Sequence, residues 1–285
     1  MRKFLKFLVL GSFLLCLSGC GEDSLKNSQV YTTVYPIEYL VNYLYGEESN
    51  VSSIYPKGAD VETYELTDKQ KENYSKGKLF VYNGLTSEKE LAREFLNQNS
   101  DLLLIDVAYG LNYEYALEEL WLSPNNFLML AKNIRNNLVD YTTSTVTVEA
   151  IEQKYEEIEE TLSFMDAELR SVATDAKKDG TSTLVVSSSK LAFLENYGFN
   201  VIVLNGDISE DSLKNAFDEG TYTDIYLCDT DEKTEFITSL EEDYEANIIS
   251  VDTLYTLSDE EANNNENYLT IMRDFIDHIR NTTLG

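Results

Sequence analysis

The sequence contains one histidine and three cysteines in 285 residues, and this scarcity excludes several kinds of site. A zinc site with two imidazole ligands cannot be built from one chain that has one histidine. The sequence also has no C-x-x-C pair, no H-E-x-x-H motif, no G-x-S-x-G turn and no glycine-rich phosphate loop. We therefore expect a protein that binds a ligand and not an enzyme.

Basic residues are scarce as well, with 22 lysines and arginines against 51 aspartates and glutamates, for a formal net charge of -29. A surface of this charge repels phosphates and anionic membranes, so no nucleic-acid partner is expected. A cation or a basic partner is compatible with it. Hydrophobic residues still make up 43% of the chain, which is long enough for two domains with cores of their own.

The first residues have the three parts of an export signal. Three basic residues precede an apolar run over residues 7–17, which is too short to span a bilayer. The segment Leu17-Ser18-Gly19-Cys20 follows and looks like the lipobox of bacterial lipoproteins, in which the cysteine carries the lipid. We expect a signal peptide over residues 1–19, a lipid anchor at Cys20 and a polar tether over residues 20–28.

The cysteine count then allows no disulfide within the mature chain. Cys16 leaves with the signal peptide and Cys20 carries lipid, so Cys228 is the one ordinary thiol. Because Cys228 ends the apolar run 225–228, we expect it to be buried and unreactive.

Short apolar segments alternate with helical patterns along most of the chain, which predicts parallel βαβ units. The expected strands cover residues 29–35, 50–55, 79–82, 102–105, 183–186, 201–204, 224–227 and 247–251. A helical pattern with one apolar face continues over residues 148–178, longer than one small domain needs.

These patterns predict an α/β fold with two βα lobes on parallel sheets. The first lobe covers residues 29–145, a long connecting helix covers residues 146–180, and the second lobe covers residues 181–285. A pair of helices broken near Ser163 is the alternative to one continuous helix.

Three local motifs add a family resemblance to this arrangement. They are Thr33-Val34-Tyr35-Pro36, the stretch LFVYNG at residues 79–84 and the stretch LWLSPN at residues 120–125. Together with the lipobox, they resemble the metal-binding lipoproteins of bacterial zinc and manganese ABC importers. The resemblance implies two lobes joined by one rigid helix, with a metal ion held in the cleft between them.

The resemblance also implies where the metal ligands lie. The stretch over residues 56–65 keeps the frame around the first family histidine but has Glu62 in its place, and the second histidine, two residues before Trp121, is replaced by Glu119. The remaining implied ligands are in the second lobe, at Ser188 within the serines 187–189, at Cys228 or Asp229 with Asp229 preferred, and at Asp252.

Every family histidine is thus replaced by an oxygen ligand or another group. Imidazole and thiolate suit zinc, whereas carboxylates suit calcium, magnesium and manganese, so we expect a harder site with weakened zinc affinity. The bound divalent ion would be zinc, manganese or calcium. The opposite alternative is a cleft that has lost its metal, with carboxylates that only form hydrogen bonds or face solvent.

Two further interpretations use the same scaffold. Tyr35, Tyr64 and Trp121, together with the carboxylates, would suit an organic cation. A repurposed surface lipoprotein would instead bind a protein or a glycan. The resemblance itself implies a monomer that works with a membrane ABC permease from the extracytoplasmic face, on the surface of a Gram-positive cell.

Overall fold

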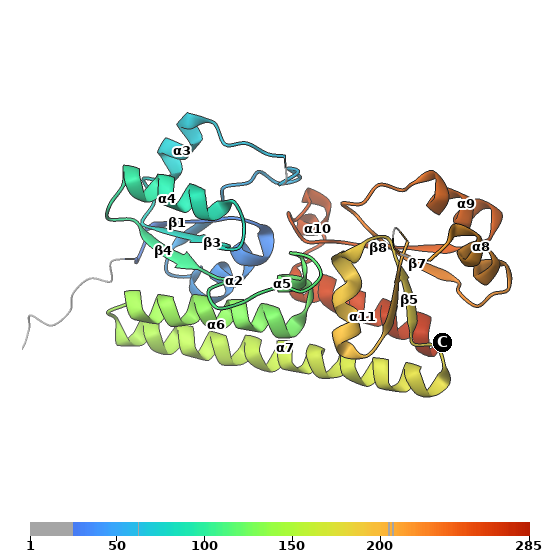
Figure 1. The fold of residues 1–285 in the computed structure, drawn as a ribbon. Helices are drawn as coiled ribbons and strands as arrows, with labels where there is room; N and C mark the ends of the chain where they lie inside the picture. The colour runs from blue at the N-terminus through green and yellow to red at the C-terminus, as the bar shows by residue number, and fades with distance from the viewer. Residues whose placement is uncertain (1–24, 62, 205, 207) are drawn as a thin grey trace, which may run out of the picture.

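The computed structural model describes residues 25–61, 63–204, 206 and 208–285. Two lobes lie next to each other along one long helix (Figure 1). Each lobe is built on a parallel four-stranded sheet, which confirms the predicted fold class. The expected signal peptide and the predicted anchor Cys20 lie outside the described residues, as does the predicted ligand Glu62.

The first lobe has the strand order β2-β1-β3-β4. Its strands are β1 (Gln29–Thr32), β2 (Asn50–Ser53), β3 (Leu79–Tyr82) and β4 (Leu103–Asp106). Its helices are α2 (Tyr35–Tyr45), α3 (Asp68–Tyr74), α4 (Glu88–Gln98), α5 (Glu119–Leu122) and α6 (Pro124–Tyr141). Tyr35, expected at the end of a strand, begins α2 because Pro36 fixes a helical φ in the first turn.

The second lobe repeats this plan with the strand order β6-β5-β7-β8. Its strands are β5 (Thr183–Val186), β6 (Asn200–Val203), β7 (Asp224–Cys228) and β8 (Asn247–Val251). The 3-10 helix η1 (Ser189–Tyr197) follows β5, and the α-helices are α8 (Glu210–Asp218), α9 (Glu235–Asp243), α10 (Asp259–Asn263) and α11 (Tyr268–Leu284).

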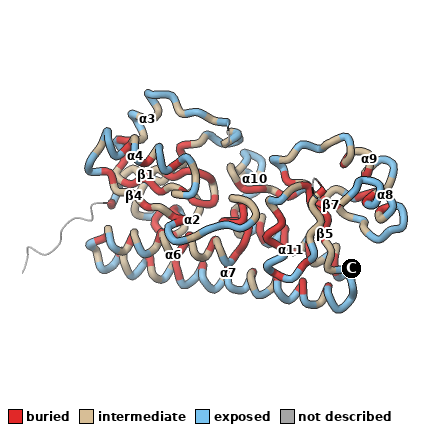
Figure 2. The backbone as a smooth tube through the Cα atoms, in the orientation of Figure 1, coloured by how far each residue is buried: buried red, intermediate tan, exposed pale blue. Residues whose placement is uncertain are grey.

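The connecting helix α7 (Thr145–Asp179) is continuous over 35 residues, so the predicted single helix is confirmed and no break occurs at Ser163. At about 1.5 Å per residue it is about 50 Å long. The Ser144 side chain accepts a hydrogen bond from the N–H of Thr147 at its start, and Gly180 ends it with a left-handed φ of 79°. Its buried residues are spaced so that one face packs on both lobes, as Figure 2 shows.

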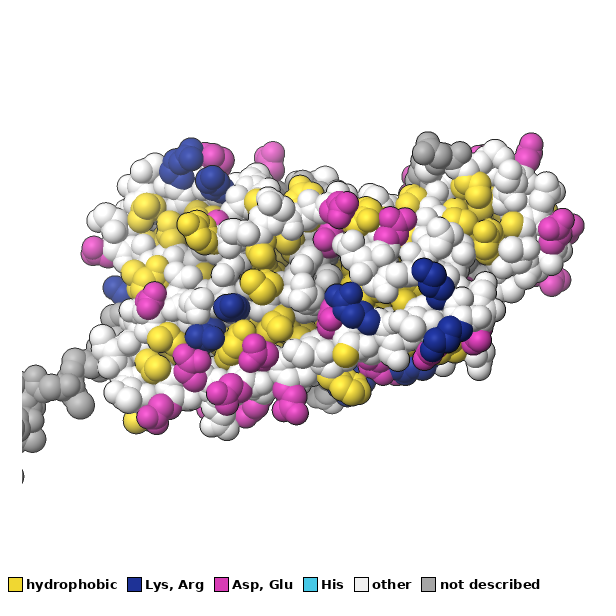
Figure 3. Space-filling view, turned by 60° about the horizontal axis from the view of Figure 1, so that its bottom comes forward, with side chains coloured by type: hydrophobic (Ala, Val, Ile, Leu, Met, Phe, Trp, Pro, Cys, Tyr) yellow, Lys and Arg dark blue, Asp and Glu magenta, His cyan; other side chains and the backbone are white. Residues whose placement is uncertain are grey.

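The two lobes share one hydrophobic core. The largest buried cluster extends from the strands of the first lobe through α6, α7 and α11 to β5 and β7. Acidic side chains are spread over the face that α7 presents in Figure 3. None of the helices among the described residues is both long and apolar enough to cross a membrane.

Both sheets have the same order of strand addition. In each sheet the chain adds one neighbour on one side of the first strand and then returns to the other side, between β1 and β3 or between β5 and β7. In sheets of this kind, ligands bind beyond the carboxyl ends of the strands at that point. The predicted ligands Ser188, Asp229 and Asp252 each follow the carboxyl end of a strand.

Candidate functional site

The predicted ligand Glu119 has its carboxylate turned toward its own chain. Its Oε2 accepts hydrogen bonds from the backbone N–H groups of Glu114 at 2.9 Å and Tyr115 at 3.1 Å. Its Oε1 lies 3.3 Å from Nδ2 of Asn126. The residue is buried, with 6% exposure. Glu119 therefore holds the loop before α5 in place, and a bound metal would have to replace some of these hydrogen bonds.

The neighbouring Glu118, which no sequence pattern singled out, points across to the second lobe. Its Oε1 accepts a hydrogen bond of 3.0 Å from the hydroxyl of Tyr255 and lies 4.0 Å from Nζ of Lys190. Because Tyr255 follows β8 and Lys190 is in η1, one first-lobe carboxylate contacts two elements of the second lobe.

Lys190 is an internal cation at this interface. Its Nζ lies 2.8 Å from Oγ1 of Thr230 and 2.8 Å from Oδ1 of Asp231. Burial lowers the pKa of Lys190. The hydrogen bond to Asp231 and the charges of Asp231 and Glu118 raise it by more than burial lowers it, so the net pKa is above its ordinary value. The side chain therefore carries its positive charge at neutral pH.

Asp231 joins the ends of β5 and β7. Its Oδ2 accepts a 2.5 Å hydrogen bond from the hydroxyl of Ser187, whose oxygen in turn accepts one of 3.1 Å from the N–H of Cys228. Burial raises the pKa of Asp231, but hydrogen bonds from Lys190 and Ser187 together bring it below its ordinary value. Asp231 is therefore ionised and neutralised by Lys190.

Cys228 is fully buried, as predicted. Burial, followed by the charge of Asp231, raises the pKa of its thiol to about 12. A metal ion would have to displace the thiol proton inside the core, whereas Asp229 is exposed beyond the end of β7, which favours Asp229 at this ligand position.

Asp229 and Asp252 lie near each other beyond the ends of β7 and β8. Oδ1 of Asp229 accepts hydrogen bonds from the N–H of Thr253 at 2.9 Å and from its hydroxyl at 2.6 Å. Oδ1 of Asp252 accepts one of 2.6 Å from the N–H of Leu254, whose φ is 62°. A left-handed φ is uncommon for leucine, so the buried Leu254 side chain and this hydrogen bond hold the loop.

Asp252 carries a proton near neutral pH. Burial raises its pKa to about 8, with further contributions from a hydrogen bond with Glu261 and from the charge of Asp229. Glu261, which is less buried, has a lowered pKa and accepts this hydrogen bond. Asp252, Glu261 and Asp229 thus form an acidic cluster in which two groups share a proton.

The predicted ligands are only partly brought together. Asp229 is near Asp252, and Ser188 is near Asp231, whereas Glu119 is bonded to its own loop. Within the described ranges, no three His, Cys, Asp or Glu side chains are grouped so that they could hold a metal ion.

The three predicted aromatic residues do not share one cavity. Trp121 is buried and donates from Nε1 to the carbonyl oxygen of Thr253 at 2.8 Å, so it packs the lobe interface. Tyr64 accepts a hydrogen bond from Nε2 of Gln70 and lines a depression within the first lobe. Tyr35 lines a separate pocket between the lobes.

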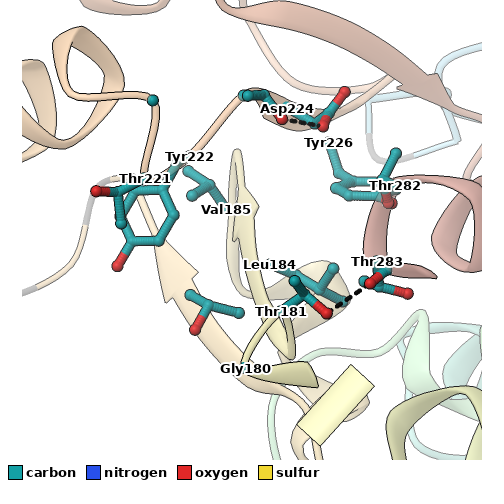
Figure 4. A pocket seen from close by; sticks show the side chains of 13 residues that line it. Gly180, Thr181, Leu184, Val185, Thr221, Tyr222, Asp224, Tyr226, Thr282 and Thr283 are labelled. Atoms are coloured by element: carbon teal, nitrogen blue, oxygen red, sulfur yellow. Dashed lines mark hydrogen bonds between the residues drawn. The ribbon is translucent and has the colours of Figure 1, made fainter. Parts of the chain in front are cut away.

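This interlobe pocket has a volume of about 290 Å³ and is rich in tyrosine. Its lining residues come from α2, the segment at and after the end of β2, and the segment after β8. They include four tyrosines and two charged residues: Tyr35, Tyr39, Tyr55, Tyr255, Glu38 and Lys57. A second cavity of about 330 Å³ lies near the start of β5 and β7 (Figure 4). Six of its thirteen lining residues are threonine, and Asp224 is the one acidic residue among them.

The comparison with known families agrees with the resemblance predicted from the sequence. The model of the family described as "ZnuA: Zinc-uptake complex component A periplasmic" matches residues 30–282. This chain belongs to the ZnuA family. The description of the family is that of a periplasmic component of a zinc-uptake complex.

Two curated proteins are similar to this ZnuA-family chain. The iron-binding protein YfeA of Yersinia pestis is 24% identical over 192 residues, which cover 64% of this chain and 61% of YfeA. The manganese-binding lipoprotein MntA of Halalkalibacterium halodurans is 23% identical over 218 residues, covering 71% of this chain and 70% of MntA. The chain thus aligns with less than two thirds of YfeA.

Solved structures share the ZnuA-family fold. The metal-dependent lipoprotein YcdH of Bacillus subtilis superimposes with a TM-score of 0.76 at 21% identity, over 90% of this chain and 99% of YcdH. The zinc-bound ZnuA-like domain of Streptococcus pneumoniae AdcA gives a TM-score of 0.75 at 19% identity, over 90% of this chain and 99% of that domain.

Proposed function

We propose that this chain is the lipid-anchored solute-binding protein of a metal ABC importer, and that it captures a divalent cation between its lobes. The ligands of this proposal are the carboxylates of Glu62, Glu119, Asp229 and Asp252, with Ser188 as a weaker or water-mediated contact. The chain would present its closed form to a membrane permease as a monomer. This function needs no covalent chemistry, only a difference in affinity between open and closed lobes.

One observation supports a cation site in particular, namely that Asp229 and Asp252 lie near each other beyond the carboxyl ends of β7 and β8, where sheets of this kind bind ligands. Burial, a hydrogen bond with Glu261 and the charge of Asp229 raise the pKa of Asp252 to about 8, so binding of a divalent cation by Asp252 would release a proton. Oxygen ligands of this kind suit manganese or calcium better than zinc.

The experiment is a calorimetric titration of the full chain, purified in mild detergent and stripped with a chelator. Manganese, calcium, magnesium and zinc are each titrated. We expect one ion per chain, with a dissociation constant in the micromolar range or below for manganese or calcium, and weaker binding of zinc. The double variant Glu62→Ala with Glu119→Ala and the single variant Asp252→Asn should each lose this binding.

The matched control is Asp274→Asn, which removes one carboxylate from the exposed face of α11. It should bind the ion as the unaltered chain does. Unchanged affinity in both ligand variants would refute the ligand assignment, and no saturable binding of any of the four ions would refute the metal function.

The tyrosine-rich pocket favours a second candidate, an organic cation. Aromatic faces attract ammonium groups, and Glu38 supplies a partly buried carboxylate whose pKa is raised by burial. Titration with tetramethylammonium should show saturable binding that Glu38→Gln weakens and that Glu47→Gln, an exposed change on the same lobe, leaves unaltered. Absence of binding would remove this candidate.

A further inference from the structure

The interlobe cleft contains a cation supplied by the protein itself. The side chains of Lys190, Asp231 and Glu118 are 17%, 14% and 4% exposed, so all three are largely removed from solvent. Two buried carboxylates repel each other unless a positive charge lies between them. The Lys190 ammonium supplies that charge, with Glu118 from the first lobe on one side and Asp231 from the second lobe on the other.

We propose that Lys190 is a specificity-determining residue that occupies the carboxylates of Glu118 and Asp231 and competes with divalent metal ions for them. This pair is distinct from the ligands proposed above but close to them in sequence, since Glu118 precedes Glu119 and Asp231 follows Asp229 by two residues. The ammonium lies among Oε1 of Glu118, Oδ1 of Asp231 and Oγ1 of Thr230. These three oxygens are of the type that calcium, magnesium and manganese use as ligands. An ion entering here would have to displace Lys190, which is tethered to η1 and therefore always present at high local concentration.

The geometry explains why the ammonium is held firmly. Asp231 is fixed by the hydroxyl of Ser187, and Glu118 is fixed by the hydroxyl of Tyr255 at 3.0 Å. Both carboxylates are thus held near the ammonium by groups other than Lys190. Removing the ammonium alone would leave both carboxylates buried and without the counter-charge of Lys190. Uncompensated buried charge is a strong driving force for binding a cation.

The test is the variant Lys190→Met, which keeps the length of the side chain and removes its charge. Calorimetric titration of the full chain with manganese and with calcium should show affinity increased by about tenfold or more over the unaltered chain. The double variant Lys190→Met with Glu118→Gln should lose this gain, because one of the two carboxylates is then neutral. Lys190→Arg should behave as the unaltered chain.

The matched control is Lys71→Met, which removes a half-buried lysine that pairs with Glu94 at 2.9 Å inside the first lobe. Metal affinity should not change. Should Lys190→Met fail to fold, as judged by thermal melting, Lys190→Gln provides the same loss of charge with a polar side chain. In either variant, affinity equal to that of the unaltered chain overturns the inference.

This inference rests on the proposed function only in taking the chain to be a metal-transport protein. Different outcomes of the experiment refute the inference and the proposed function. If the unaltered chain binds no metal and Lys190→Met does, the inference stands and the native metal function fails. If the unaltered chain binds metal and Lys190→Met binds it no better, the native function stands and the inference fails. If neither protein binds metal, both are refuted.

Discussion

The indole Nε1 of Trp121 donates a hydrogen bond of 2.8 Å to the carbonyl oxygen of Thr253, 132 residues away. Both residues are buried, and they belong to different lobes. The hydroxyl of Tyr268 donates in turn to the carbonyl oxygen of Trp121 at 2.5 Å. A buried polar network thus links the two lobes without a ligand.

Replacing Trp121 with Phe should destabilise the protein by about 2–4 kcal/mol. The substitution removes part of a buried ring and leaves the carbonyl oxygen of Thr253 without its donor. The measurement is the free energy of unfolding from urea denaturation. Tyr109→Phe is the control, since Tyr109 is 80% exposed, and it should change stability by less than about 0.5 kcal/mol. Equal stability of the two variants would contradict the role given to Trp121.

Stability should decrease as pH rises because of Glu88, the first residue of α4. Burial raises the pKa of Glu88 to about 7, although its carboxylate accepts a 2.7 Å hydrogen bond from the N–H of Asn83. The folded state therefore binds this proton more tightly than the unfolded state, whose ordinary value is 4.5. The stabilisation is complete below pH 4.5 and is lost as pH rises to about 7.

The loss amounts to about 3 kcal/mol at alkaline pH. Glu88→Gln should remove this part of the pH dependence, so the variant is more stable than the unaltered chain at pH 8 and similar to it at pH 4. Urea denaturation across this range is the measurement. Glu149→Gln, an exposed change on α7, should keep the original profile. A Glu88→Gln profile parallel to that of the unaltered chain would show that Glu88 does not titrate as stated.

The C-terminal end of α7 depends on a glycine. Gly180 has a φ of 79°, and a Cβ built there would contact nothing within 4 Å. Gly180→Ala should therefore cost only the backbone strain of the left-handed conformation, about 1 kcal/mol. Thermal or urea unfolding measures this. Lys177→Ala in the same last turn should cost less than about 0.5 kcal/mol, and a Gly180→Ala cost no larger than this would argue against strain.

The predicted lipid anchor is testable in cells. Cys20→Ser removes the thiol that the lipobox resemblance assigns to lipid, so the variant should appear in the soluble fraction and incorporate no labelled palmitate. Fractionation of cells that express each form gives the answer. Cys228→Ser is the matched control, because that thiol is buried, and it should keep both the label and the membrane association. Membrane association of Cys20→Ser would contradict the anchor.

The sequence by itself determined the classes of element and their order. The period of apolar residues in the 145–179 segment marks one face of a helix, and its start and end signals at Ser144 and Gly180 are local. The parallel sheets likewise follow from short apolar strands separated by helices. Such properties depend on neighbours within a few residues, which is why they can be inferred without tertiary structure.

Only the tertiary structure decided which polar side chains face each other. Glu118 and Glu119 are adjacent in sequence, yet one points to Lys190 and the other to its own loop. The partner of Glu118 comes from η1, and that of Asp252 comes from the segment around α10. These pairings depend on how the carboxyl ends of two separate sheets meet. The packing of both lobes on α7 sets the distance between these ends, so no local sequence pattern can predict it.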